Sequence, residues 1–318
     1  MLRRTLAIIV MLCVATLLYA AGCGKQPAPK IEQQQQQPTR EEPTISLYDN
    51  DTGQKKMIKI EEYVQGVVAA EMDVKWPVNA LAAQAVLART FTMENIKSGR
   101  VKELHGADVS TSIEESQAYE PSKINDNVRQ AVAATRGEVV TYNGSYIHAW
   151  FSACDGGISA TAEEGLAYNK EPTPYIKGGV QDGCLEITEP KNKEWQAKIP
   201  VGQVQAAVQG KTSQNTGAVT TASIEKKGPS GRAEQIKVGG ATISGPALRL
   251  ALGSEKVRST LLTGISVSGG QLVLTGKGFG HGVGMCQWGA RLMAEQGKTP
   301  EEIINFYFQD VSIQKEWN

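Results

Sequence analysis

The stretch at residues 61–91 constrains the fold most, because its apolar pattern predicts two helices. In the first helix, apolar side chains recur at the three- and four-residue spacing that places them on one face. These side chains are Tyr63, Val64, Val67 and Val68. Pro77 ends this helix, and Trp76 before it is pushed toward extended geometry. A second helix follows, and its many alanines permit close packing.

Glu71 extends the apolar face of the first predicted helix, because it follows Val67 by four residues and Val68 by three. A carboxylate in that position is either paired with a cation or held in a poorly solvated cleft. Poor solvation raises a carboxyl pKa, which suits a general acid that acts near neutral pH. The pattern alone leaves open a helix-surface ion pair and a catalytic acid. The other acidic residues of the stretch are expected to be solvated charges: Glu61, Glu62 and Asp73.

A second informative stretch has glycine at every other position from Gly276 to Gly284. One face of an extended segment would then carry no side chains, which suits a backbone pressed against another surface or an extended ligand. The spacing matches neither a dinucleotide-binding fingerprint nor a P-loop. His281 lies within the run, with Gln287 and Trp288 beyond it. A histidine flanked by glycines has little apolar packing, so we expect a functional role; a buried histidine bonded to main chain is the alternative.

The third stretch surrounds His148 and Cys154 and ends in a pair of glycines. His148 and Cys154 could share one metal ion, with Cys184 or His281 completing the set. Their spacing is not a standard zinc pattern such as C-x-x-C. A disulfide between Cys154 and Cys184 is the competing interpretation, and Cys286 would then be a free thiol. The sequence alone does not decide between them.

The first 23 residues have the form of a signal peptide with a lipobox. Arg3 and Arg4 precede an apolar run that is too short for a membrane span, and Ala-Ala-Gly-Cys follows. We expect Cys23 to carry lipid, so that the exported chain is anchored to the outer face of the cytoplasmic membrane; ordinary secretion is the alternative. Removal of the leader leaves 31 of the 33 Lys and Arg residues against 33 Asp and Glu. That balance predicts no nucleic-acid binding, and membrane attachment through the lipid alone.

Residues 24–43 are predicted to form a polar linker, and residues 44–318 the folded domain. Short strand and turn patterns at about residues 191–262 predict an inserted subdomain. An Asn-Gly pair at residues 143–144 predicts the turn of a hairpin. Further helices are expected at residues 125–135, 245–253, 286–296 and 300–308. The predicted fold class is α+β, with a helical catalytic core, short antiparallel strands and an inserted mostly-β subdomain.

Taken together, these stretches resemble the stage II sporulation protein D / amidase-enhancer family from about Ile45 to Val311. The motifs that carry the resemblance are Tyr-Val-Gln-Gly-Val-Val-Ala-Ala-Glu at 63–71, Trp-Pro at 76–77, Ala-Arg-Thr at 88–90, His148 with Gly-Gly at 156–157, Ser-Gly-Arg at 230–232, and Gly-Phe-Gly-His-Gly-Val-Gly-Met-Cys-Gln-Trp-Gly-Ala at 278–290. Members include lytic transglycosylases, which cut peptidoglycan glycan strands that lack stem peptides. The resemblance implies that Glu71 is the catalytic acid and base. It also implies a sugar-binding cleft lined by Gln84, Arg89, His148, His281 and Gln287.

A lytic transglycosylase needs only one carboxyl group, whereas a hydrolysing glycosidase usually needs two at a set separation. Glu71 and Asp73 are two residues apart and do not face each other on a helix. The acid protonates the glycosidic oxygen, the muramyl 6-hydroxyl attacks the same sugar, and the acid, now a base, takes the hydroxyl proton. The nucleophile belongs to the substrate, so one glutamate suffices. We therefore expect 1,6-anhydro-muramyl ends, formed during wall remodelling linked to sporulation.

The resemblance leaves a second function open, a non-catalytic wall-binding activator of a cell-wall amidase. Some family members also bind zinc through a histidine and cysteine cluster, which His148 and Cys154 match in part. Ser159 and Ala160 stand where further ligands are expected, so we predict no required cofactor, with zinc as the alternative. A metal-dependent hydrolase is the third function that these residues allow.

Overall fold

A computed structural model describes residues 40–318 of the chain. The predicted leader, the lipid-bearing Cys23 and the predicted linker up to residue 39 lie outside the described residues. The backbone N–H of Arg40 donates to the carbonyl of Glu316 at 3.1 Å, so the described chain begins and ends side by side. Among residues 40–318, no helix combines the length and apolarity that a bilayer crossing requires.

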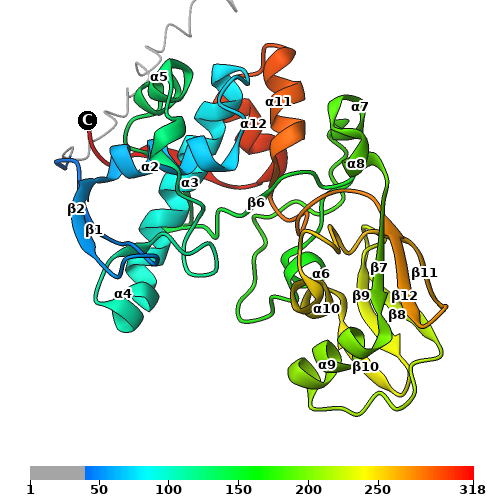
Figure 1. The fold of residues 1–318 in the computed structure, drawn as a ribbon. Helices are drawn as coiled ribbons and strands as arrows, with labels where there is room; N and C mark the ends of the chain where they lie inside the picture. Colours follow the sequence, from blue (N-terminus) through cyan, green and yellow to red (C-terminus); the bar gives the residue numbers. More distant parts are fainter. Residues whose placement is uncertain (1–39) are drawn as a thin grey trace, which may run out of the picture. The chain divides into compact units, whose positions relative to one another are not determined.

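The described chain mixes helices with small sheets, which confirms the α+β prediction (Figure 1). The helices are α2 (Ile60–Glu71), α3 (Val78–Ser98), α4 (Arg100–His105), η1 (Pro121–Lys123), α5 (Asp126–Ala134), α6 (Ala162–Leu166), α7 (Cys184–Ile187), α8 (Pro190–Lys193), α9 (Val201–Thr212), α10 (Gly245–Leu252), α11 (Gln287–Glu295) and α12 (Pro300–Tyr307). The strands are β1 (Thr44–Tyr48), β2 (Lys55–Lys59), β3 (Val109–Ser110), β4 (Glu138–Tyr142), β5 (Ser145–Tyr146), β6 (Phe151–Ser152), β7 (Trp195–Pro200), β8 (Ala222–Lys227), β9 (Ala233–Val238), β10 (Ala241–Ser244), β11 (Leu262–Ser268), β12 (Gln271–Gly276), β13 (Met285–Cys286) and β14 (Ser312–Lys315).

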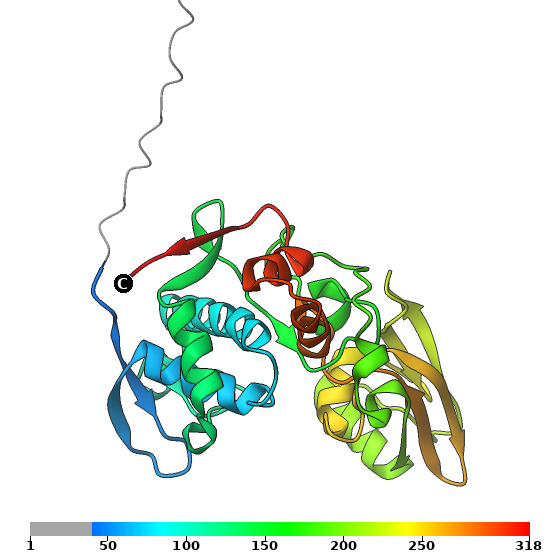
Figure 2. The same ribbon diagram turned by 90° about the horizontal axis from the view of Figure 1, so that it is seen from above.

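Helix α3 is the centre of the helical part, and α2, α5, α11 and α12 all pack against it (Figure 2). It is buried on every side through its middle turns, because its run of small alanine side chains lets neighbouring elements approach closely. The helix ends at Gly99, whose φ of 73° is left-handed, the conformation that glycine adopts most readily at this position. The two helices expected at residues 61–91 are therefore confirmed.

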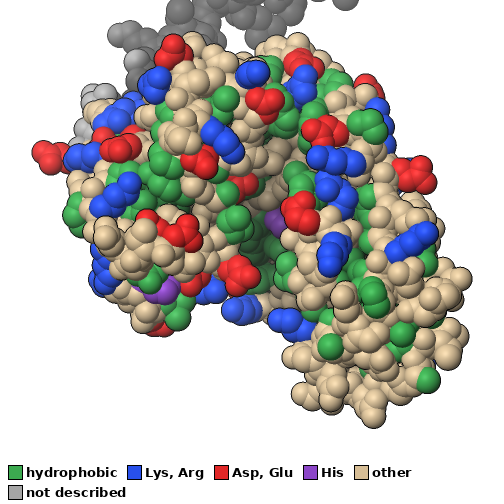
Figure 3. Space-filling model, viewed as in Figure 1, with side chains coloured by type: hydrophobic (Ala, Val, Ile, Leu, Met, Phe, Trp, Pro, Cys, Tyr) green, Lys and Arg blue, Asp and Glu red, His purple; other side chains and the backbone are tan. Residues whose placement is uncertain are grey.

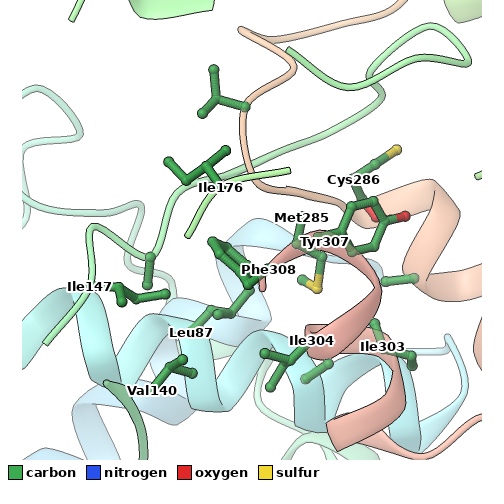
Figure 4. Close-up of a cluster of buried hydrophobic side chains, with 14 of the residues drawn as sticks. Leu87, Val140, Ile147, Ile176, Met285, Cys286, Ile303, Ile304, Tyr307 and Phe308 are labelled. Atoms are coloured by element: carbon green, nitrogen blue, oxygen red, sulfur yellow. The ribbon is translucent and has the colours of Figure 1, made fainter. Parts of the chain in front are cut away.

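A cluster of buried apolar side chains lies where α12 and the segment after β4 cover α3 (Figure 4). Leu87 of α3 contributes to this cluster together with Val140 of β4, Ile147 after β5, and Ile304 and Phe308 of α12 and its C-terminal end. A capping box at Thr299 and Glu302 begins α12 and directs its apolar face inward. The cluster joins the C-terminal helices to the N-terminal helical part.

The inserted subdomain has its own core and two three-stranded sheets, with strand orders β11-β12-β7 and β10-β9-β8. Helices α9 and α10 pack against these strands. Strands β11 and β12 form a hairpin whose second strand pairs with β7. The subdomain therefore reaches Gly276, beyond the boundary near residue 262 that we expected, because β7 has its pairing partner in that later hairpin.

Candidate active site

Glu71 is the last residue of α2 and stands at the end of the buried stripe that includes Val67 and Val68. Its Oε1 accepts a hydrogen bond of 3.1 Å from the backbone N–H of Ala118. Burial raises the pKa of Glu71 above its ordinary value, and the Ala118 N–H and the Gln287 side chain offset part of that rise. The residue keeps partial exposure. A raised pKa favours the protonated form that a general acid needs, and the partial exposure lets the carboxyl group reach a ligand.

Two glutamines adjoin this carboxyl group. Nε2 of Gln287, the first residue of α11, donates a hydrogen bond of 3.3 Å to Oε1 of Gln84 in α3. Gln84 is fully buried, and its Nε2 has no hydrogen-bond partner among residues 40–318. The hydrogen bond brings the second helix of the 61–91 stretch together with the end of the glycine run, so the structure unites Glu71, Gln84 and Gln287.

The loop that contacts Glu71 is held against α2 and α3. Gln117 donates through Nε2 to the carbonyl of Ala88 at 3.3 Å and to Oγ1 of Thr92 at 3.1 Å. Gly66 of α2 leaves room for the Tyr119 ring, which any added Cβ would meet. The backbone donor of Ala118 is therefore fixed in place opposite the carboxylate.

The glycine run lies against the protein's own backbone. Strand β13 pairs in parallel with β6, and Phe279 bridges to Cys154. A Cβ at Gly284 would collide with the Trp150 carbonyl, and one at Gly282 with the Arg232 guanidinium. Of the two alternatives for the glycine face, the structure shows a backbone pressed against another surface and not an extended ligand, because this chain already occupies that face.

His281 is held as a neutral imidazole. Its Nδ1 accepts a hydrogen bond of 3.0 Å from the backbone N–H of Val283. Burial, followed by the charges of Arg249 and Arg232, lowers the pKa of His281 to about 3. The ring also hydrogen-bonds to the backbone of Phe151. The structure thus supports the alternative of a histidine bonded to main chain, and places no hydrogen bond between His281 and Glu71 within residues 40–318.

His148 belongs to a separate polar cluster. Its Nε2 lies 2.6 Å from Oε1 of Glu171 and 2.9 Å from the Tyr168 hydroxyl, and its ring stacks on Trp150. Hydrogen bonds to Glu94 and then to Glu171 raise the pKa of His148 above its ordinary value. The partly exposed ring can contact a ligand. Its neighbours were missed by sequence reasoning, since they are scattered over residues 94–171.

The prediction that Arg89 lines a sugar-binding cleft is wrong, because its side chain lies in the core. Its guanidinium is completely buried and forms a two-pronged ion pair with Glu61, at 3.0 Å from Nε to Oε1 and 2.7 Å from Nη2 to Oε2. Glu61 also accepts hydrogen bonds from the Gly137 N–H and the Trp317 indole. We expected Glu61 to be a solvated charge, and that prediction is wrong. Its carboxylate instead accepts hydrogen bonds from three separate segments of the chain. Exposed Glu62 and Asp73 agree with the expectation.

Cys154 and Cys184 lie side by side as free thiols, with 3.4 Å between their sulfurs. The structure brings the expected pair together without a covalent bond, so the disulfide stays a prediction. Cys286 lies in the same cluster, also buried and free. His148 is in neither of the metal-compatible clusters found among residues 40–318, and the buried Ser159 hydroxyl donates to the Lys177 carbonyl. The zinc arrangement of the family therefore does not fit this chain.

Two tryptophans were also missed as candidate site residues. Trp76, just after α2, and Trp288, next to Gln287, meet with ring centroids 4.7 Å apart, and both are partly exposed. The Arg291 guanidinium covers both rings at 5.4 and 5.1 Å. Their sequence signal was present in the Trp-Pro and Gln-Trp motifs, but their contact could be known only from the fold.

Figure 3 shows that the face viewed is hollowed between the helical part and the part with the inserted subdomain, with both acidic and basic side chains on the rim.

Known proteins share sequence with most of this chain. Residues 48–142 match the family model described as stage II sporulation protein, and residues 167–284 match a domain of unknown function. An uncharacterized protein of Brachyspira hyodysenteriae is 35% identical over 80% of this chain and 67% of its own length. Stage II sporulation protein D of Bacillus amyloliquefaciens is 30% identical over 87% of this chain and 81% of its own length. The amidase enhancer of Bacillus subtilis is 27% identical over 79% of this chain but only 40% of its own length. The chain belongs to the stage II sporulation protein D / amidase-enhancer family.

Proposed function

We propose that this chain is a lytic transglycosylase that cleaves peptidoglycan glycan strands lacking stem peptides, in wall remodelling linked to sporulation. The observation that carries the proposal is the setting of Glu71, a desolvated yet reachable carboxyl group held by the Ala118 N–H beside Gln287 and Gln84. The names of two relatives, which refer to sporulation and to enhancement of an amidase, support a role at the cell wall.

In the proposed reaction, Glu71 donates its proton to the glycosidic oxygen as the bond breaks. The 6-hydroxyl of the muramyl residue attacks the same sugar and forms the 1,6-anhydro ring. The Glu71 carboxylate then takes the hydroxyl proton, which returns the enzyme to its starting state. Because the attacking group is part of the substrate, no second carboxylate is required. Gln287 and the unpartnered Nε2 of Gln84 are placed to hydrogen-bond polar groups near Glu71.

The Trp76 and Trp288 rings are tilted at 58° to each other, and their aromatic faces are proposed to contact the apolar faces of sugar rings. His148, with Glu94 and Glu171, is proposed as a second, more distant polar contact for the glycan. His281 is proposed to support the cleft through its main-chain bonds and not to transfer protons.

The experiment digests purified glycan strands without stem peptides and identifies the new ends by mass spectrometry. We expect anhydro-muramyl ends with the wild type and a loss of at least about 100-fold in rate with Glu71→Gln. The matched control is Glu62→Gln, because Glu62 is an exposed carboxylate on the same helix. Equal rates for wild type and Glu71→Gln, or reducing muramyl ends in place of anhydro ends, would remove this function.

A second candidate is a non-catalytic activator of a cell-wall amidase, favoured by the similarity to a protein named amidase enhancer. The same variants separate the two functions. An activator would stimulate a purified amidase equally well with Glu71→Gln and would release no glycan fragments by itself.

We also propose that the chain is exported and anchored to the outer face of the cytoplasmic membrane through lipid on Cys23. The support is the basic, apolar and Ala-Ala-Gly-Cys pattern of the first 23 residues. Such an anchor would place the folded domain on the same side of the membrane as the glycan.

A further inference from the structure

Three buried cysteines meet next to the candidate active site, although they are far apart in the sequence. Cys154 follows β6, Cys184 begins α7, and Cys286 ends β13. Their sulfur atoms all lie within 4.8 Å of one another, and each side chain is at most 1% exposed. Sequence reasoning paired the first two and left Cys286 alone, since nothing in the spacing places it beside them.

A buried carboxylate lies beside these thiols. Oδ1 of Asp155 accepts from the Gly157 N–H at 2.8 Å and lies 3.1 Å from the Cys184 sulfur. Its Oδ2 is buried and has no hydrogen-bond partner among the described residues. Asp155 also belongs to a second close cluster, with Asp182, Cys184 and Cys286. A buried carboxylate oxygen left unpaired is costly unless something positively charged or hydrogen-bonding occupies the space beside it.

Backbone N–H groups point at one of the three sulfurs. The Cys286 sulfur accepts from the backbone N–H groups of Asp155 and Gly289, each at 3.4 Å, and Gly289 lies in the first turn of α11. The Arg232 guanidinium donates to the Asp155 carbonyl. Backbone donors and a helix N-terminus are the usual means of stabilising metal-bound thiolates.

We propose that Cys154, Cys184 and Cys286 bind one thiophilic divalent cation, with Zn²⁺ as the expected ion. A Zn–S bond of about 2.3 Å and tetrahedral angles put neighbouring ligand atoms roughly 3.8 Å apart. The observed separations of 3.4 Å for one sulfur pair and at most 4.8 Å within the thiol cluster need only small side-chain rotations. All three sulfur ligands are buried, so the site is out of reach of substrate and is structural and not catalytic.

This site differs from the family arrangement around His148 in both its ligands and its consequence. Cys286 is followed directly by Gln287, whose side chain bonds to Gln84 beside Glu71. A cation held by Cys286, Cys154 and Cys184 would fix the start of α11 against β6 and α7. It would thereby hold Gln287 in register with the candidate acid, whether or not that acid cleaves glycan.

The test measures the zinc content of the full chain, purified in buffers without chelator or added metal. We expect one zinc per chain for the wild type and at least about a tenfold loss for Cys184→Ser and for Cys286→Ser. His148→Ala is the matched control and should keep its zinc. A wild type without zinc whose mass shows Cys154 joined to Cys184 would overturn the proposal, as would loss of zinc in His148→Ala.

Cobalt substitution of the wild type provides a second measurement that does not depend on the folding of cysteine variants. We expect a thiolate-to-cobalt charge-transfer absorption together with the strong visible bands of a tetrahedral site. Asp155→Asn should keep the charge transfer, because the three sulfurs remain. A cobalt protein without thiolate absorption would contradict the ligand set. Neither measurement uses glycan, so failure here leaves the proposed cleavage by Glu71 untouched, and the reverse also holds.

Discussion

Gln287, the first residue of α11, donates a hydrogen bond from Nε2 to Oε1 of Gln84 in the middle of α3, 203 positions earlier in the chain. Both side chains are buried, and the Gln287 amide also faces Glu71 at the end of α2. Three helices therefore contribute to one small polar site inside an otherwise apolar contact. Such a site depends on the mutual packing of α2, α3 and α11, and each of the following predictions tests one part of that packing or of its chemistry.

The rate of glycan cleavage should fall as pH rises through the pKa of Glu71, because the first step needs the protonated acid. Burial raises that pKa above the ordinary glutamate value, so the midpoint of the fall in kcat/KM should lie above it. Gln287→Leu should move the midpoint further up, since the amide stabilises the charged form. A pH profile with a midpoint at or below the ordinary value would contradict the proposed role.

Glu71→Gln should also stabilise the fold at neutral pH, by on the order of 0.5–1 kcal/mol. A raised folded-state pKa means that ionised Glu71 costs stability as pH rises through it, and an amide does not ionise. Thermal unfolding at two pH values checks this: the advantage of the variant should be present at pH 8 and should shrink in acid. The same advantage at both pH values would point to a cause other than ionisation.

Arg89→Ala should destabilise the protein by about 3–5 kcal/mol, because it leaves the Glu61 carboxylate buried without its cation. Urea unfolding followed by circular dichroism measures the loss. Arg129→Ala is the matched control, since its ion pair with Asp126 is exposed and should contribute about 0.5 kcal/mol or less. If Arg89→Ala lost glycan binding and kept its stability, Arg89 would be a substrate-binding residue of the cleft and not a core residue.

His281 and His148 should have widely separated pKa values when their titration is followed by nuclear magnetic resonance. The measurement is practical because the chain has only 3 histidines. His281 should remain neutral down to a pKa of about 3, and His148 should titrate above 6.5. The raised pKa of His148 adds stability that is present in acid and is lost as pH rises through the folded-state value.

Glu94→Gln should lower the pKa of His148, because the hydrogen bond to Glu94 is the largest cause of the shift. Glu103→Gln, which changes an exposed residue of α4, should leave that pKa where it is. Equal shifts from the two variants would mean that general charge, and not the local cluster, sets the pKa.

Gly284→Ala should destabilise the protein by about 2 kcal/mol or more, because the new Cβ meets the Trp150 carbonyl at a φ of 72°. Gly269→Ala is the matched control: its φ of 55° is also left-handed, but nothing lies within 4 Å, so about 1 kcal/mol is expected. Equal losses would mean that conformation alone, and not packing against β6, requires glycine in the run.

Cys23→Ser should release the mature chain from the membrane fraction into the medium or the soluble envelope fraction. Lipid on the cysteine is the attachment that we propose, and a mass measurement of the N-terminal peptide would detect it directly. A serine variant that stays with the membrane would contradict lipid anchoring through this residue.

The sequence by itself determined the local elements and one candidate acid. Helical spacing predicted α2 and α3, and the Asn-Gly pair predicted the turn between β4 and β5, because each of these signals lies within a few residues of its effect. The position of Glu71 on the apolar face followed from the same periodicity. The identities of Gln84 and Gln287 could be proposed from motifs, but not their contact.

Only the tertiary structure decided which polar residues reach a ligand and which are consumed by the fold. In the sequence, Arg89 and Glu61 cannot be told from residues of a solvated ion pair. The structure buries them in the core with Trp317 from the far end of the chain. The glycine run allowed either a close backbone contact or an extended ligand, and the structure pairs it with β6. The gathering of Cys154, Cys184 and Cys286 likewise follows from long-range pairing, which periodicity cannot report because it records only the faces of single elements and not what those faces meet.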